Sequence, residues 1–175
     1  MDNYAFIDMQ NLYLSVKAQG WELDYKKFRI YLKDKYQVSK AYAFLGYISK
    51  NEKFYKTLRD NGYKIIFKPT IKRRKQPIKG NCDTEFVLHT ILQINNFNKA
   101  IIISGDGDFY CLIRHLKQKN KLLKIGIPNQ ARFSYLLKRF KTDLLFISQL
   151  EEKLKKEAYS PGQAPQAASR RIESG

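Results

Sequence analysis

Short apolar runs alternate with amphipathic segments along almost the whole chain, and this alternation limits the folds that the chain can adopt. The run "YAFID" at residues 4–8 precedes an amphipathic pattern, and the succession continues through "KAIIIS" at 99–104 and "LLKIGIP" at 122–128. Strands that alternate with helices of about 10 to 15 residues favour a parallel sheet covered on both faces. The alternation predicts an α/β fold, a three-layer α/β/α sandwich with a mainly parallel central sheet.

The expected helices have the right periodicity for one buried face. After Asp108, the residues Phe109, Leu112, Ile113 and Leu116 fall at positions i, i+3, i+4 and i+7. This spacing places apolar side chains on one side of an α-helix. We therefore expect these segments to cover the sheet as amphipathic helices.

The chain divides into one domain and a short appendage. The alternation predicts a single α/β domain over residues 1–150, followed by a charged C-terminal helix over residues 151–159. Residues 160–175 are rich in Pro, Gly, Ala, Gln and Ser and can bury little apolar surface. We expect them to form a flexible tail, either native or a cloning remnant.

The chain is strongly basic. It has 33 lysines and arginines against 16 acids, for a formal net charge of +17. A positive field of this size favours a polyanionic partner, and nucleic acid is the leading candidate. The competing interpretation is a basic surface that only confers solubility.

The sequence contains no recognisable export signal or membrane segment. Its start, "MDNYAFID", lacks a basic and apolar leader pattern, and no apolar run approaches the roughly 20 residues needed to span a bilayer. Cys82 and Cys111 form no CxxC pair, and with only His89 and His115 a zinc site would require both pairs to converge. We expect a cytoplasmic protein without a membrane partner.

Four aspartates come from segments that a parallel sheet would bring to one edge. Asp8 ends the first strand, Asp106 and Asp108 follow "IIIS", and Asp83 opens the helix that leads into that strand. Reactive crevices of open parallel sheets lie beyond the carboxyl ends of the strands. The four carboxylates are therefore expected to converge, with Asn11 and Ser104 close by.

Converging carboxylates repel one another unless a cation bridges them. Oxygen ligands of this kind suit Mg²⁺ or Mn²⁺, ions that polarise phosphodiesters and activate water. Each acid also has a simpler interpretation: Asp108 as a helix cap, Asp83 as a first-turn acid, and the "GDGD" glycines as a tight turn. Asn11 and Ser104 fit supporting hydrogen bonds to the acids or ordinary turn and cap positions equally well.

A basic segment precedes the second acidic position. Residues 64–79, "KIIFKPTIKRRKQPIK", contain no acid, and two prolines keep much of the segment out of regular structure. The predicted nucleic-acid contacts are Lys72, Arg73, Arg74, Lys75 and Lys79. The alternative is a solvated charged loop.

Three motifs carry a resemblance to a known family. "FIDMQNLY", "KGNCDTEFVL" and "SGDGDFYCLIRHL", in this order, resemble the three acidic motifs of the NYN domain, in the LabA-like branch of the PIN superfamily. The resemblance covers residues 3–150 and implies a PIN-like fold with Mg²⁺- or Mn²⁺-dependent endoribonuclease activity. It assigns the site to Asp8, Asp83, Asp106 and Asp108, with Asn11 and Ser104 in support.

The chain departs from the family pattern at two places. Met9 stands where many members have glycine. His89 and Thr90 stand where members often carry another acid after the second motif. The second departure leaves open whether one metal ion or two would act.

The leading hypothesis is a metal-dependent endoribonuclease acting on single-stranded or loop RNA, with Lys79 and residues 72–75 orienting the backbone. The alternative is a non-catalytic RNA-binding or adaptor module with the same fold. A small-molecule phosphotransferase is a third class, but Gln10 occupies the position where the haloacid dehalogenase pattern needs a second aspartate. The sequence leaves the oligomeric state open, a homodimer included.

Overall fold

The computed structural model describes residues 2–68 and 83–157. The predicted RNA-binding residues lie outside this part of the chain, as does the tail expected over residues 160–175. The RNA-binding residues concerned are Lys72, Arg73, Arg74, Lys75 and Lys79.

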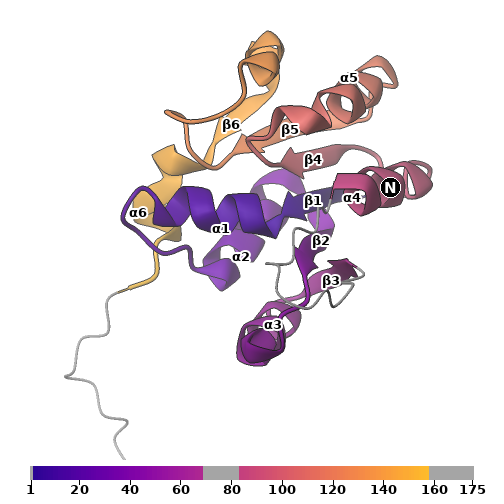
Figure 1. Ribbon diagram of the computed structural model, residues 1–175. Helices are drawn as coiled ribbons and strands as arrows, with labels where there is room; N and C mark the ends of the chain where they lie inside the picture. Colours follow the sequence, from indigo (N-terminus) through magenta and orange to yellow (C-terminus); the bar gives the residue numbers. More distant parts are fainter. Residues whose placement is uncertain (1, 69–82, 158–175) are drawn as a thin grey trace, which may run out of the picture.

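Six strands of the described residues form one parallel sheet in the order β3-β2-β1-β4-β5-β6 (Figure 1). Every ladder between neighbouring strands is parallel. The predicted α/β sandwich is therefore confirmed, and the sheet is parallel throughout. The strands are β1 (Asn3–Asp8), β2 (Val38–Gly46), β3 (Tyr63–Lys68), β4 (Ala100–Ile103), β5 (Leu122–Ile127) and β6 (Leu144–Phe146).

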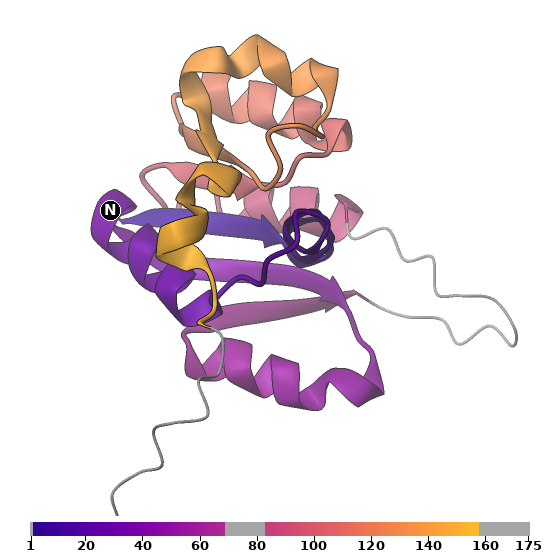
Figure 2. The same ribbon diagram turned by 90° about the vertical axis from the view of Figure 1, so that its left-hand side faces the viewer.

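The helices cover both faces of the sheet (Figure 2). The α-helices are α1 (Met9–Lys17), α2 (Tyr25–Tyr36), α3 (Glu52–Asp60), α4 (Asp83–Leu92), α5 (Tyr110–Gln118) and α6 (Glu151–Leu154), and the 3-10 helices are η1 (Ser49–Asn51), η2 (Gly107–Phe109), η3 (Tyr135–Asp143) and η4 (Ile147–Leu150). Across residues 2–68 and 83–157, no helix is both long enough and apolar enough to cross a bilayer.

Two hydrophobic layers meet at the central strands. Ile7 faces the layer that contains α1, α2 and α3, whereas Phe6 faces the layer that contains α4 and α5. Because side chains alternate along a strand, β1 contributes to both layers at once. This explains why the β1 and β4 segments read as nearly continuous apolar runs.

Two elements near the C-terminus differ from the sequence-based expectation. The segment expected to cover the sheet after β5 is the 3-10 helix η3, which has non-helical backbone angles at Phe140. The charged helix expected over residues 151–159 ends at Leu154, because Lys155 is extended and pairs antiparallel with Leu23. Pairing with a distant segment therefore ends this helix before its charged sequence does.

Truncation of Phe6 tests the importance of the β1 layer. Its ring is fully buried, with centroids 5.4 Å from Tyr42 and 5.6 Å from Phe97. Phe6→Ala should lower the free energy of unfolding by about 3–5 kcal/mol, because it leaves a cavity among aromatic rings. Urea unfolding monitored by circular dichroism measures the change.

Leu92→Ala is the matched control, since Leu92 is 67% exposed on α4. Its effect should stay within about 0.5 kcal/mol. Equal losses for the two variants would contradict the assignment of Phe6 to the core.

Candidate active site at the carboxyl edge of the sheet

The carboxyl ends of β1 and β4 meet at the centre of the sheet. Ile7 pairs with Ile103, so Asp8 and Ser104 follow at the same edge. The chain winds from β1 outward to β3, and from β4 outward to β6. In doubly wound sheets, the point where this winding reverses is where ligands bind. The ends of β1 and β4 therefore stand where this class of fold forms its sites.

Hydrogen bonds tie the end of β1 to the loop after β4. Asp8 Oδ1 accepts from the backbone N–H of Asn11 at 3.0 Å, which makes Asp8 the N-cap of α1. The hydroxyl of Ser104 donates to Asp8 Oδ2 at 3.2 Å and accepts from the N–H of Asp106 at 3.1 Å. Asn11 Oδ1 accepts from the N–H of Gly105 at 2.9 Å. Asn11 and Ser104 therefore hold the two acidic segments together.

The surroundings of Asp8 oppose its charge. Burial raises the pKa of Asp8 and is the largest effect, while the hydrogen bonds from Asn11 and Ser104 lower this pKa. The negative charges of Asp83 and Asp106 raise it further. Because charge interactions weaken with distance, Asp83 and Asp106, from two other segments, lie close enough to Asp8 for their charges to act on it.

Asp106 and Asp108 occupy different positions in the turn after β4. Asp106 Oδ1 accepts from the N–H of Asp108 at 3.0 Å and so caps η2. The helix-cap interpretation of Asp108 does not apply to α5, whose N-cap is Phe109. Asp108 is exposed to solvent beside the partly buried Asp106.

Asp83 opens α4 and shares its first turn with a second acid, Glu85. A helix N-terminus favours negative charge, which suits both residues. Glu85 Oε2 is buried and has no hydrogen-bond partner within residues 2–68 and 83–157. The sequence analysis did not single out Glu85, although "DTE" places both acids in one helical turn.

The glycines of "GDGD" admit a neighbouring loop. Gly105 O accepts from the N–H of Ser134 at 2.9 Å. A Cβ on Gly107 would lie 2.3 Å from Ser134 Oγ, so a larger residue there would force Ser134 to move. The loop after β5 therefore packs against the acidic turn, a contact that the sequence analysis did not foresee.

His89 and Thr90 supply no substitute for the additional acid of many family members. The ring of His89 packs on Tyr42 and Phe44, with centroids 4.7 and 5.6 Å apart, and burial lowers the pKa of His89. Thr90 is buried and donates to Phe86 O at 2.8 Å. Both residues serve the packing of α4 on the sheet.

The donor chemistry at this edge fits a hard divalent cation. Asp8, Asp83 and Asp106 offer oxygen ligands, and a bound cation would relieve the repulsion that Asp83 and Asp106 exert on Asp8. Within the described part of the chain, however, no three side chains among His, Cys, Asp and Glu are grouped closely enough to hold one ion. The acids share an edge without forming a complete coordination shell.

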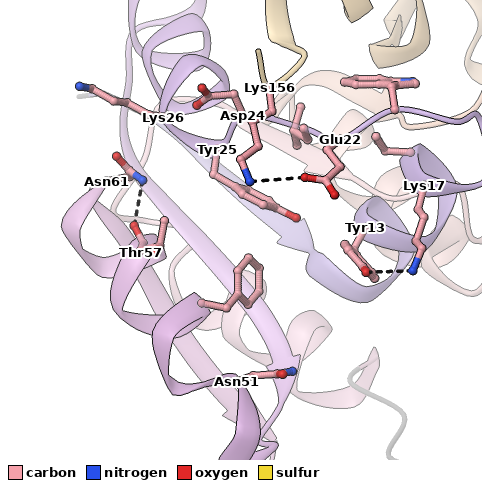
Figure 3. Close-up of a pocket in the computed structure, with 14 residues that line it drawn as sticks. Tyr13, Lys17, Glu22, Asp24, Tyr25, Lys26, Asn51, Thr57, Asn61 and Lys156 are labelled. Carbon is pink, nitrogen blue, oxygen red and sulfur yellow. Dashed lines mark hydrogen bonds and ion pairs between the residues drawn. The ribbon is translucent and has the colours of Figure 1, made fainter. Parts of the chain in front are cut away.

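A groove of about 660 Å³ lies elsewhere, between α1, α2 and α3 (Figure 3). Tyr13 and Tyr25 line it, and Glu22 forms an ion pair with Lys156 at 3.4 Å. None of the four predicted aspartates lines this groove. The predicted acids and this groove therefore lie at different places on the fold.

This chain is similar to known proteins both in sequence family and in fold. The family model of the NYN domain matches residues 4–148. A solved structure of a protein of unknown function from Vibrio parahaemolyticus is similar, with a TM-score of 0.73 and 26% sequence identity, over 89% of this chain and 96% of that one. A comparison with the curated proteins found no match.

Asp8→Asn tests the charge repulsion at this edge. Asparagine keeps the capping oxygen and removes the buried charge, so the variant should unfold at a higher temperature than the wild type in EDTA. Thermal unfolding monitored by circular dichroism measures the shift. Ser104→Ala should instead lower the free energy of unfolding by about 1–3 kcal/mol, because it leaves buried polar groups without partners.

Asp34→Asn is the control for removal of one negative charge, since Asp34 is exposed on α2. Its effect should stay within about 0.5 kcal/mol. A destabilised Asp8→Asn variant would show that the charge of Asp8 is compensated in the fold.

Proposed function

Because the chain belongs to the NYN domain family, we propose that it is a metal-dependent endoribonuclease of the LabA-like branch, which hydrolyses RNA phosphodiester bonds. The NYN domain is part of the PIN-like nuclease superfamily, which supports a hydrolase role at a coarse level. The specific reaction, metal and substrate are our proposal. Its setting would be the cytoplasm.

One observation carries the proposal. The hydroxyl of Ser104 bonds to both Asp8 Oδ2 and the N–H of Asp106, so acids from two segments about a hundred residues apart meet at one point, and the charge of Asp83 acts on Asp8 as well. Asp8 and Asp106 lie at the edge where doubly wound sheets bind ligands. A fold that only needed helix caps would have no reason to bring mutually repelling carboxylates together here.

In the proposed mechanism, Asp8, Asp83, Asp106 and Asp108 would hold Mg²⁺ or Mn²⁺, which requires these side chains to move closer together than the described residues place them. Such an ion, when bound, polarises the phosphodiester and makes water a stronger nucleophile. The chain itself positions the acids: Ser104 and Asn11 fix Asp8 relative to the turn that carries Asp106.

The carboxylates of the described residues support a proposal about the number of metal ions, which the sequence leaves open. His89 and Thr90 offer none beyond the first turn of α4. Glu85 is a further acid in the first turn of α4, beside Asp83, and its Oε2 is buried. We propose a single ion, with Glu85 as the residue to examine if a second is detected.

The substrate proposed is single-stranded or loop RNA. The net charge of +17 favours a polyanion. Lys79 and residues 72–75 are proposed to orient the RNA backbone, as the sequence predicts.

A non-catalytic RNA-binding module is the second candidate. The observation that favours it is that the described part of the chain contains no ready-made group of three metal ligands. RNA affinity that is unchanged by EDTA, without products under any metal, would support this alternative.

Cleavage of labelled RNA decides between the two functions. The wild type should cut a single-stranded oligonucleotide with Mn²⁺ or Mg²⁺, and EDTA should abolish the products. Asp106→Asn should lower the rate by about 100-fold or more, since it removes a charge at the reacting centre. Gel electrophoresis of timed samples measures the rates.

Asp34→Asn again serves as the matched charge control and should cleave at the wild-type rate, because Asp34 lies on α2, outside the proposed site. Cleavage that persists equally in EDTA and in Asp106→Asn would reject the mechanism and point to a contaminating nuclease.

A further inference from the structure

We infer that single-stranded RNA lies across the start of η3 and the loop before it as it reaches the acidic edge. The inferred contacts are four exposed residues, Arg132, Tyr135, Lys138 and Arg139, named here the η3 surface. The inference rests on the proposed function for the class of its ligand. It adds a binding surface within the described residues, separate from residues 72–75 and Lys79.

The η3 surface is fixed against the acidic turn. The segment that carries it follows β5, whose carboxyl end lies at the same sheet edge as that of β4. Ser134, at the start of this segment, donates to Gly105 O at 2.9 Å and approaches Gly107 closely. An RNA strand that contacts η3 would therefore lie near Asp106 without any rearrangement of the fold.

The geometry of η3 separates its side chains into three rows. In a 3-10 helix, residues three apart share a face. Leu137 and Phe140 are buried, and Leu136 lies on the side of Gly107. Tyr135 and Lys138 share the third row, in which both are exposed, at the start of η3.

The exposed row combines an aromatic ring with a cation. Tyr135 is 76% exposed, and Lys138 Nζ lies 5.3 Å from the centroid of its ring. An exposed ring of this kind offers a stacking platform for an unpaired base, and the neighbouring cation suits the phosphate. A base-paired duplex would not expose its base faces to Tyr135.

The cations of the η3 surface are not neutralised by the fold. Residues 128–142 contain no acid. Among the described residues, Arg132, Lys138 and Arg139 take part in no ion pair. Arg139 instead donates to the hydroxyl of Tyr110, at 3.5 Å, two residues beyond Asp108. Free positive charge beside the acids favours a phosphate backbone over a neutral ligand.

Binding in EDTA tests the surface separately from catalysis. The probe is a fluorescein-labelled single-stranded oligouridylate of 20 nucleotides, titrated with the full 175-residue chain. The variants are Arg132→Ala combined with Lys138→Ala, then Tyr135→Ala, and Tyr135→Phe as the conservative replacement. Fluorescence anisotropy over a series of salt concentrations gives the dissociation constants and their salt dependence.

The charge variant should reduce the slope of log K against log salt by about 1.4, which corresponds to two lost phosphate contacts on a single strand. Tyr135→Ala should weaken binding by about 5- to 100-fold through lost stacking, and Tyr135→Phe should bind like the wild type. Lys26→Ala combined with Lys33→Ala removes two exposed cations on α2 and should leave the slope unchanged.

Wild-type affinity and salt slope in the η3 variants would overturn the inference, even if the protein cleaves RNA with metal. Lost binding in these variants would support it, even if no metal yields products. Equal affinity for a duplex of the same length would overturn the single-strand assignment. If none of the η3 substitutions weakened RNA binding but an acidic peptide displaced the RNA, the result would point to a protein partner and would also overturn the inference.

Discussion

The parallel pairing of β1 with β4 is the contact on which the rest of the site depends. It joins two segments that are about a hundred residues apart and aligns their carboxyl ends at the point where the winding of the sheet reverses. Ser104 and Asn11 then connect the two ends, through bonds to Asp8 and Gly105 that span 96 and 94 residues. Without this pairing, the acids would be unrelated turn residues.

The fold places Asp8 in surroundings that raise its pKa. Burial and the neighbouring charges of Asp83 and Asp106 both work against ionisation of Asp8. Two hydrogen bonds and the N-terminus of α1 act in the other direction. This arrangement is typical of a functional site, where stability is given up for chemistry. In the proposed function, a divalent cation would bind the carboxylates at this edge, and an RNA backbone would bind the cations of the η3 surface.

Much of the fold was accessible from the sequence because its signals are local. The apolar runs of β1 and β4 are continuous, since each strand is buried on both faces. The strand-end rule places Asp8 and Asp106 at one edge from the sequence alone. The 3-10 form of η3, the end of α6 at Leu154 and the buried oxygen of Glu85 could not be read in this way. The end of α6 depends on the pairing of Lys155 with the distant Leu23, and no local pattern marks the other two.

The order of apolar and amphipathic segments by itself determined the class of fold, the succession of its strands and the segments that carry acids. Only the tertiary structure decided which atoms meet: Asn11 with Gly105, His89 with the aromatic layer, and Ser134 with the acidic turn. The physical reason is the range of the forces. Periodic burial acts within one segment, whereas a hydrogen bond or a close approach requires two segments to be positioned to within an ångström or less.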